Sequence, residues 1–220
     1  MTVKGFASIA SVGGCICVKR QGSVVKFTFD WNCVIAVENG QPEAPDLQAL
    51  VELHRERRIE VALLAASASE NTRSRIFPGS ARLFEERRSS IGWDDLPLVL
   101  MPAARGLSYF DYSYIVGDAD TFNSDVDALW RVLATRVERN PLRHLPGDLR
   151  WDDAAIQSTH LSKWRNAWCD VMSAYSHIRA GRDVFVTLNT KHFQKNSEKL
   201  RNIGMRCIAA PERALRIPRY

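Results

Sequence analysis

Two short, largely apolar runs constrain the fold of this chain more than any other feature. Residues 59–66 read IEVALLAA, and residues 183–187 read DVFVT. Runs of this length and composition are typical of strands that are buried on both faces of a parallel sheet. Each run follows a stretch of helical periodicity, over 46–58 and 160–180 respectively. Strands that alternate with helices predict an α/β fold of three layers, with a mainly parallel central sheet between helices.

Weaker patterns complete the expected order of elements. Residues 15–18 and 24–29 are rich in β-formers, and the segment between them predicts a hairpin at the start of the chain. Apolar spacing and turn residues indicate the remaining elements. We expect helices over 67–76, 78–90, 124–139, 197–203 and from 211, and strands over 98–101, 113–116 and 205–209.

Length and composition place the chain among ordinary globular proteins. Its 220 residues suit one α/β domain, so we expect a single domain over 1–220. No stretch approaches the roughly 20 apolar residues that cross a bilayer, so we expect no membrane partner. The five cysteines have neither a zinc-binding spacing nor a dense disulfide pattern. They indicate reduced thiols and therefore a cytoplasmic protein.

Acidic and amide side chains follow the predicted strands at the edge where parallel sheets bind ligands. Asp30 directly follows one strand, and Glu70 lies just beyond another, in the first turn of the expected helix. Asn189 lies two residues past the strand that ends at Thr187. A helix rises about 1.5 Å per residue and a strand about 3.3 Å, so the chain from Asp170 returns to the same edge at Asn189.

Carboxylates that meet in one crevice repel one another unless a cation lies between them. Their hard oxygen atoms suit Mg²⁺ or Mn²⁺, so Asp30, Glu70 and Asp170 are candidate metal ligands. An Asp after a strand is also a common helix cap or turn former, and that interpretation stays open on geometry alone.

Three segments resemble the PIN-domain (PilT N-terminus-like) ribonucleases. The sequence FTFDWNCVI over 27–35 is similar to the family's first strand, which ends in Asp with Asn or Ser two places later, here Asp30 and Asn32. The sequence ASASEN places Glu70 where the family has an acid at a helix start. The strongest match is WCDVMSAYSHIRAGRDVFVTLNTKHF over 168–193, which is similar to the family's C-terminal signature. Its matching residues are Asp170, Ala174, Gly181, Thr187, Asn189 and Phe193.

The resemblance implies an endoribonuclease that needs one or two Mg²⁺ or Mn²⁺ ions and hydrolyses phosphodiester bonds, usually in single-stranded RNA. Asp30 and Asp170 would be the main metal ligands. Glu70 would bind metal directly or through water, or orient the attacking water. Asn189 would stand where many members have a fourth Asp. The residues that would hold these carboxylates by hydrogen bonds are Thr187 and Asn32.

The chain also departs from the family pattern. Asn189 is neutral, so the site has one charge fewer. The spacing between the matching segments implies an insertion over about 78–150, and residues 1–23 form an N-terminal extension before the strand at 24–29. Acidic pairs in or beside the insertion remain alternative ligands. These alternatives are Asp118 with Asp120 and Asp152 with Asp153.

The positive charge of the chain lies mostly near its C-terminal end. Residues 191–220 contain eight Lys or Arg against two Glu, within a formal net charge of +5. Because Lys191, His192 and Lys195 directly follow Asn189, we expect them to border the metal site and contact nucleic acid. The alternative nucleic-acid face consists of Arg73, Arg75, Arg82, Arg87 and Arg88.

Two functions from different classes follow from the sequence. The first is an active ribonuclease, in one variant the toxin of a toxin–antitoxin pair. The second is a catalytically weak or inactive PIN-like module that binds RNA or serves as a scaffold. RNA is the expected partner in both, and single-stranded DNA, a homodimer and an antitoxin-like partner remain open.

Overall fold

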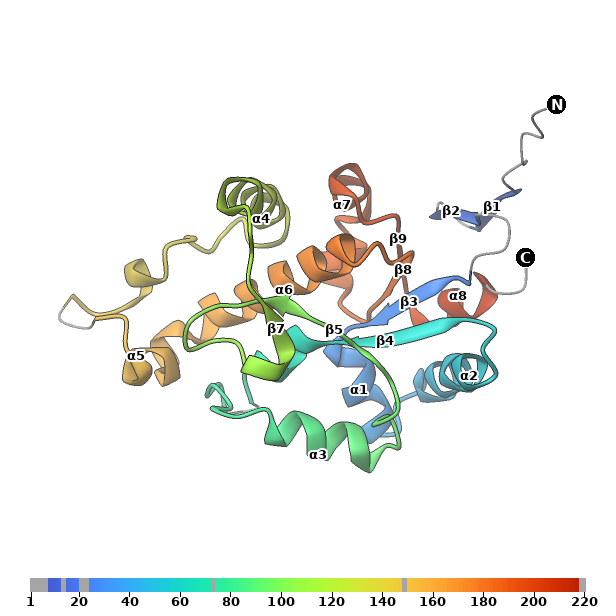
Figure 1. The fold of residues 1–220 in the computed structure, drawn as a ribbon, viewed down its shortest axis with the longest axis horizontal. Helices are drawn as coiled ribbons and strands as arrows, with labels where there is room; N and C mark the ends of the chain where they lie inside the picture. The colour runs from blue at the N-terminus through green and yellow to red at the C-terminus, as the bar shows by residue number, and fades with distance from the viewer. Residues whose placement is uncertain (1–7, 13–14, 20–23, 73, 148–149, 218–220) are drawn as a thin grey trace. The chain divides into compact units, whose positions relative to one another are not determined.

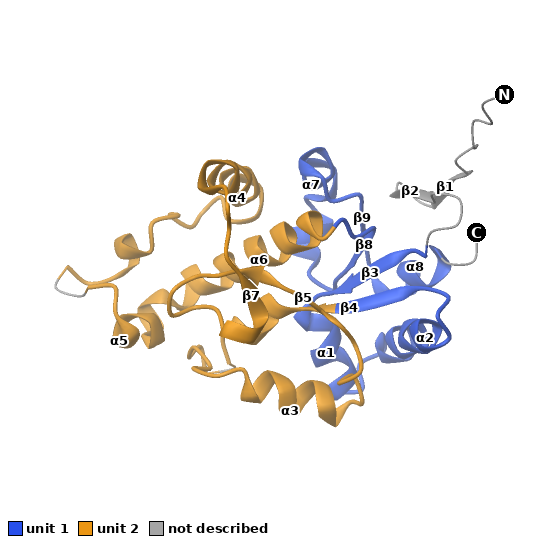
Figure 2. Cartoon of the chain, viewed as in Figure 1, with its two compact units in different colours: residues 1–62, 181–220 blue, residues 63–180 orange. Residues whose placement is uncertain are grey.

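The computed structural model describes residues 8–12, 15–19, 24–72, 74–147 and 150–217. The chain divides into two compact units (Figure 2). Unit 1 comprises residues 1–62 and 181–220, and unit 2 comprises residues 63–180. The single domain, its extension over 1–23 and its insertion over 78–150 stay predictions. No helix in the described part of the chain is long and apolar enough to cross a membrane.

Five parallel strands form the central sheet, as the apolar runs predict. Their order across the sheet is β5 (Leu98–Val99), β4 (Glu60–Leu64), β3 (Lys26–Phe29), β8 (Val184–Val186) and β9 (Cys207–Ala209). All residues of β8 and β9 are buried, which explains why their sequences show no alternation of polar and apolar residues. The register pairs Phe27 with Val184 and Phe29 with Val186, so β3 and β8 end together.

Helices cover both faces of the strands in unit 1. Helix α2 (Ala44–Arg55) packs against α1 (Trp31–Glu38) and α8 (Pro211–Arg216). Figure 1 shows these three on one side of the strands and α7 (Ser197–Ile203) on the other. The arrangement gives the three layers that the sequence predicts.

Unit 2 is built around the long helix α6 (Ser162–Arg179), which packs against α4, β6 and a 3₁₀ turn, η1. Its other elements are short. They are η1 (Ala65–Ser69), α3 (Arg82–Ser90), β6 (Met101–Pro102), the 3₁₀ turn Phe110–Tyr112, β7 (Ser113–Tyr114), α4 (Ala119–Leu133), the 3₁₀ turn Pro141–His144, α5 (Asp153–Gln157) and the 3₁₀ turn Thr159–Leu161. The two short strands β6 and β7 pair in parallel.

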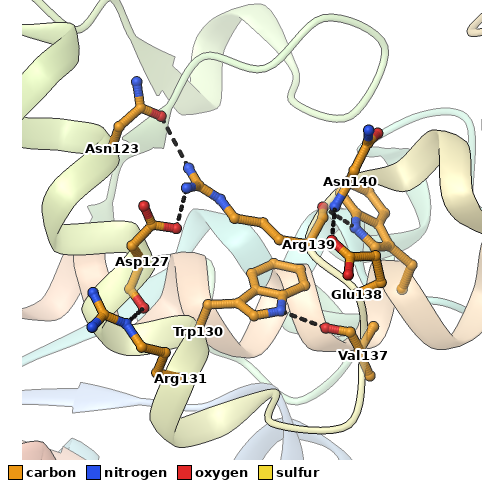
Figure 3. Close-up of polar contacts among 9 residues, drawn as sticks. Asn123, Asp127, Trp130, Arg131, Val137, Glu138, Arg139 and Asn140 are labelled. Atoms are coloured by element: carbon orange, nitrogen blue, oxygen red, sulfur yellow. Dashed lines mark hydrogen bonds and ion pairs between the residues drawn. The ribbon is translucent and has the colours of Figure 1, made fainter.

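The segment after α4 is fixed to that helix by polar contacts (Figure 3). The Nε1 atom of Trp130 donates to the carbonyl oxygen of Val137 over 2.7 Å. The guanidinium of Arg139 forms an ion pair with Asp127 and donates to Asn123 over 2.9 Å. These contacts stabilise a connection that has no regular structure of its own.

Tryptophan rings pack along the same region of unit 2. Trp164 of α6 contacts Trp130 at 6.2 Å between ring centroids, Trp151 at 5.8 Å and Trp168 at 6.3 Å. Aromatic side chains bury large apolar areas, so this cluster provides much of the core of the unit.

A glycine allows a close approach between two segments of unit 2. Gly106 has φ +76°, and a Cβ atom there would lie 2.4 Å from Cδ1 of the buried Ile156 in α5. A side chain at this position would therefore meet both backbone strain and a steric clash.

The structure differs from several expectations near the N-terminus and after β4. The hairpin joins β1 (Ser8–Val12) to β2 (Cys15–Lys19), whereas the sequence suggested 15–18 with 24–29. The expected helix over 67–76 is wrong, because the described residues of this range form a 3₁₀ turn, Ala65–Ser69, and no α-helix. Polar side chains beyond that turn bond to other segments or to nearby backbone, which competes with helical hydrogen bonding.

One cysteine also differs from expectation. Cys207 is disulfide-bonded, so the prediction that all thiols are reduced is wrong at this position. Cys33 and Cys169 are free and buried.

Candidate functional site

Asp30 lies where the sequence predicted a ligand, directly after β3. Its backbone N–H donates to the carbonyl oxygen of Val186 over 3.0 Å, which continues the pairing with β8 by one residue. The chain then turns into α1, and the Oδ1 atom of Asp30 caps that helix by accepting from the Trp31 N–H over 2.8 Å. Asp30 is only 2% exposed. The alternative interpretation, that Asp30 caps a helix, therefore applies to one of its two carboxylate oxygens, Oδ1.

The second oxygen of Asp30 accepts two side-chain hydrogen bonds. The Thr187 hydroxyl donates to Oδ2 over 2.7 Å, and the Asn32 amide donates to the same atom over 3.1 Å. Thr187 follows β8 directly and is fully buried. These are the two residues that the resemblance assigned to holding the carboxylates, and the structure brings both to Asp30.

The negative charge of Asp30 affects a neighbouring thiol. Burial, and after it the charge of Asp30, raises the pKa of Cys33 well above its ordinary value. The Cys33 thiol donates to the carbonyl oxygen of Val186 over 3.4 Å. Cys33 is therefore a buried neutral group that helps to pack α1 on β8, rather than a reactive thiolate.

Asn189 is joined to the same cluster through its backbone. Its N–H donates to the Thr187 hydroxyl oxygen over 2.9 Å. Its side-chain oxygen accepts from the backbone N–H of His192 over 3.0 Å and so caps a π-helical turn, Thr190–Gln194. This turn is absent from the sequence-based expectation. The amide oxygen that would replace a fourth carboxylate is thus engaged in local structure.

Exposed cations follow Asn189 as predicted. Lys191 and His192 lie in the π-helical turn, and Lys195 ends it. All three side chains are exposed. Lys191 and Lys195 form no ion pair with other described residues, which leaves their charge available to an anionic partner.

Glu70 and Asp170 belong to unit 2. Glu70 follows the 3₁₀ turn instead of opening a helix, which corrects the expectation of its local structure. Asp170 lies in the middle of α6, and α6 packs against that turn. Both carboxylates are half-buried. Because Asp30 and Asn189 belong to unit 1, a single crevice for all four residues stays a prediction.

A buried arginine holds the segment next to Glu70. Arg165 of α6 is fully buried, and its Nε atom donates to the Asn71 side-chain oxygen over 2.7 Å. Its guanidinium also donates to three backbone carbonyl oxygens. These belong to Arg75 at 3.1 Å, Ile156 at 2.5 Å and Ser158 at 2.8 Å. Burial lowers the pKa of Arg165.

Sequence reasoning missed this arginine and had little signal for it. Arg165 lies within a helical pattern whose arginines are ordinarily expected at the surface. Its partners are separated from it by up to 94 positions, so no local pattern reveals the pairing. The remaining hint is that Asn71 follows Glu70 directly, because Asn side chains often bond to distant backbone or side chains in turns.

The chemistry of the donor set partly fits the implied metal ion. A carboxylate has about four lone-pair sites, so three hydrogen bonds to Asp30 do not by themselves exclude a bond to a cation. Among the described residues, however, no three His, Cys, Asp or Glu side chains gather where they could hold a metal ion. Two of the alternative acids have a local structural role, since Asp118 caps α4 and Asp152 caps α5.

No protein-family model, no curated protein and no solved structure matches this chain. The resemblance to PIN-domain ribonucleases therefore rests on the motifs of the sequence.

Proposed function

We propose that this chain is a Mg²⁺- or Mn²⁺-dependent endoribonuclease that hydrolyses phosphodiester bonds in single-stranded RNA. The observation that carries the proposal is the oriented carboxylate of Asp30. It lies at the carboxyl ends of two adjacent parallel strands, where α/β proteins bind ligands. Thr187 and Asn32 fix it through one oxygen, as the motif resemblance anticipates.

The roles of the chain's own residues follow from their chemistry. Asp30 would hold a divalent ion through a carboxylate that Thr187 and Asn32 orient. Glu70 and Asp170 are the further ligands that the resemblance supplies. When bound, the ion makes water a stronger nucleophile at neutral pH and stabilises the leaving oxygen. Lys191, His192 and Lys195 attract the phosphate backbone.

The test is cleavage of end-labelled single-stranded RNA with Mg²⁺, Mn²⁺ or EDTA. We expect wild type to cleave with metal and not with EDTA. Asp30→Asn should lower the rate by at least about 100-fold, because removal of an outer hydrogen-bonding partner alone costs 10- to 100-fold at metal sites. A single-stranded DNA substrate in the same assay defines the substrate range.

Asp183→Asn is the matched control. Asp183 lies in the same unit and also accepts hydrogen bonds, but at the amino end of β8, where its carboxylate contacts the Lys26 N–H and Arg206. We expect it to cleave at the wild-type rate. Circular dichroism verifies that each variant is folded. Glu70→Gln and Asp170→Asn test the two proposed ligands that belong to unit 2. Equal activity of Asp30→Asn and wild type would contradict the proposal.

A specific observation supports a second candidate, a weakly catalytic RNA-binding module. Asn189 replaces a carboxylate with an amide whose oxygen caps the π-helical turn. A site with fewer charges binds divalent ions less tightly. This candidate predicts RNA binding without metal-dependent cleavage, and with no Mn²⁺-induced rise in Tm.

A further inference from the structure

Unit 2 presents two large apolar side chains almost completely to solvent within one short segment. Phe110 is 96% exposed and Ile115 is 90% exposed. Phe110 opens the 3₁₀ turn Phe110–Tyr112, and Ile115 directly follows the strand β7. Single exposed apolar residues are common on protein surfaces. Two such residues five positions apart, each with nearly its whole side chain in water, call for a binding role more than isolated ones do.

Anchored aromatic rings lie on both sides of Phe110 in the sequence. Tyr109 stacks on Phe77 with ring centroids 6.2 Å apart and an interplanar angle of 18°. Tyr112 contacts Phe84 of α3 edge-on at 5.9 Å, and its hydroxyl donates to Glu85. The backbone on either side of Phe110 is therefore fixed, and a ligand that stacks on its ring has little ordering cost to overcome.

The pKa values of the flanking tyrosines agree with this anchoring. Burial, and after it the neighbouring Cys169, raises the pKa of Tyr109 well above its ordinary value. Burial and the hydrogen bond to Glu85 raise the pKa of Tyr112 to about 12. Both rings are neutral at physiological pH, so they support Phe110 without adding charge beside it.

Two exposed arginines lie in the segments that carry these rings. Arg75 precedes Phe77 by two residues, and Arg105 precedes Tyr109 by four. Neither forms an ion pair with another described residue. Arg75 also belongs to the alternative nucleic-acid face of the sequence analysis, whereas Arg73 of that face lies outside the described residues. Exposed cations in the same segments as an exposed aromatic ring fit a ligand with both phosphates and planar rings.

Residues 105–112, called the aromatic segment, are hydrogen-bonded to Ser69, which directly precedes the predicted catalytic residue Glu70. The Ser69 hydroxyl donates to the carbonyl oxygen of Leu107 over 2.6 Å. Glu70 follows Ser69 directly, and Asn71 is held by Arg165, which also contacts the carbonyl oxygen of Arg75. A strand of nucleic acid on Phe110 would thus lie on a segment rigidly connected to Glu70.

We propose that Phe110 is a stacking platform for a base of single-stranded RNA, with Arg75 and Arg105 contacting the adjacent phosphates. The proposal rests on the proposed ribonuclease function and adds a substrate-binding subsite to it. Stacking is independent of base identity, because every base has an aromatic face. The subsite would therefore hold the strand in place without selecting a sequence.

The test measures binding of fluorescein-labelled oligoadenylate by anisotropy in EDTA, so that cleavage does not interfere. Phe110→Ala should raise Kd about 5- to 100-fold, the range that corresponds to the loss of one base–aromatic stack. Phe110→Trp should retain affinity. Leu142→Ala is the control, because it removes an apolar side chain that is 51% exposed elsewhere in unit 2 and cannot stack, and it should leave Kd unchanged.

Two further measurements separate the outcomes. An oligonucleotide with 2-aminopurine reports stacking directly, and its quenching should be lost in Phe110→Ala. Sedimentation of each variant tests the other use of an apolar surface, contact with a protein. If Phe110→Ala and Ile115→Ala alter self-association while RNA affinity stays at the wild-type value, the surface binds protein and the stacking proposal is overturned.

The result is independent of the nuclease assay. Metal-dependent cleavage together with an unchanged Kd for Phe110→Ala overturns the stacking platform and leaves the ribonuclease proposal standing. Weakened binding by Phe110→Ala together with an absence of cleavage supports the stacking platform and overturns the ribonuclease proposal. A wild-type protein that binds no oligoadenylate in EDTA overturns the platform.

Discussion

At the two ends of the strands in unit 1, buried charged side chains have different kinds of hydrogen-bonding partner. At the amino ends, Arg182 donates to the carbonyl oxygen of Phe27 and pairs with Glu60 at 2.6 Å. At the carboxyl ends, the contacts of Asp30 include three neutral donors, which are a hydroxyl, an amide and a backbone N–H. A guanidinium cancels a carboxylate's charge, whereas neutral donors orient a carboxylate without cancelling it.

Under the proposed function, the difference would separate a structural end of the strands from a functional one. An ion pair that satisfies both partners ties strands together and offers nothing to a ligand. An oriented carboxylate retains its attraction for a cation. We therefore expect substitutions at the amino ends to change stability, and substitutions at the carboxyl ends to change cleavage.

The largest effect on stability is expected at Arg182. Arg182→Met leaves the Phe27 carbonyl oxygen without this donor and Glu60 without its partner, so the free energy of unfolding should fall by about 2–3 kcal/mol. Urea unfolding measures it. Arg206→Ala removes the more exposed pair with Asp183 and should cost less than about 1 kcal/mol. Equal losses of unfolding free energy in the two variants would contradict the structural role given to Arg182.

Thr187 should respond in cleavage more than in stability. Thr187→Val keeps the shape of the side chain but removes the hydroxyl that orients Asp30 and accepts from Asn189. We expect cleavage to fall about 10- to 100-fold, at a cost in stability of about 1–2 kcal/mol. Thr187→Ser keeps the hydroxyl and should retain most of the activity. Loss of activity in both variants would indicate that packing, and not the hydrogen bond, matters.

The smallest effect concerns pH at the amino ends. Burial alone would raise the pKa of Glu60, but the hydrogen bond and charge of Arg182 outweigh it and hold the pKa below its ordinary value. A lowered pKa in the folded state stabilises the fold above the ordinary value of about 4.5, and this contribution is lost as the pH falls through the folded pKa.

The matching experiment compares wild type with Glu60→Gln. Because Glu60 is partly exposed, the difference in free energy of unfolding between the two should be under about 1 kcal/mol at pH 7. It should shrink as the pH falls below about 4.5, since protonated Glu60 resembles Gln. A difference that stays constant from pH 7 to pH 3 would contradict the role given to the charge of Glu60.

The sequence predicts these strand ends well because their signal is local. The apolar runs identify β4 and β8, and the residue that follows a parallel strand must lie at the carboxyl edge. The contacts of Asp30 with Thr187 and Asn32 are consistent with that reasoning. The range 197–203 expected for a helix is α7 itself, because Ser197 opens it and Gly204 ends it.

Prediction fails where distant side chains replace local hydrogen bonds. The helix expected over 67–76 is absent because Asn71 bonds to Ser162 and Arg165, more than 90 positions away. The π-helical turn after Asn189 escapes detection, since its cap uses a residue that the family resemblance assigned to the catalytic site. The disulfide of Cys207 likewise depends on proximity in three dimensions, which cysteine spacing alone does not show.

Gly106 has a consequence for how this protein tolerates natural variation. Position 106 combines φ +76° with a site where a Cβ atom would lie 2.4 Å from Cδ1 of Ile156. Any other amino acid there would have a strained backbone conformation and would have to shift the Ile156 side chain. In a saturation library selected for folded protein, position 106 should therefore retain glycine almost exclusively, even though it carries no chemistry of its own.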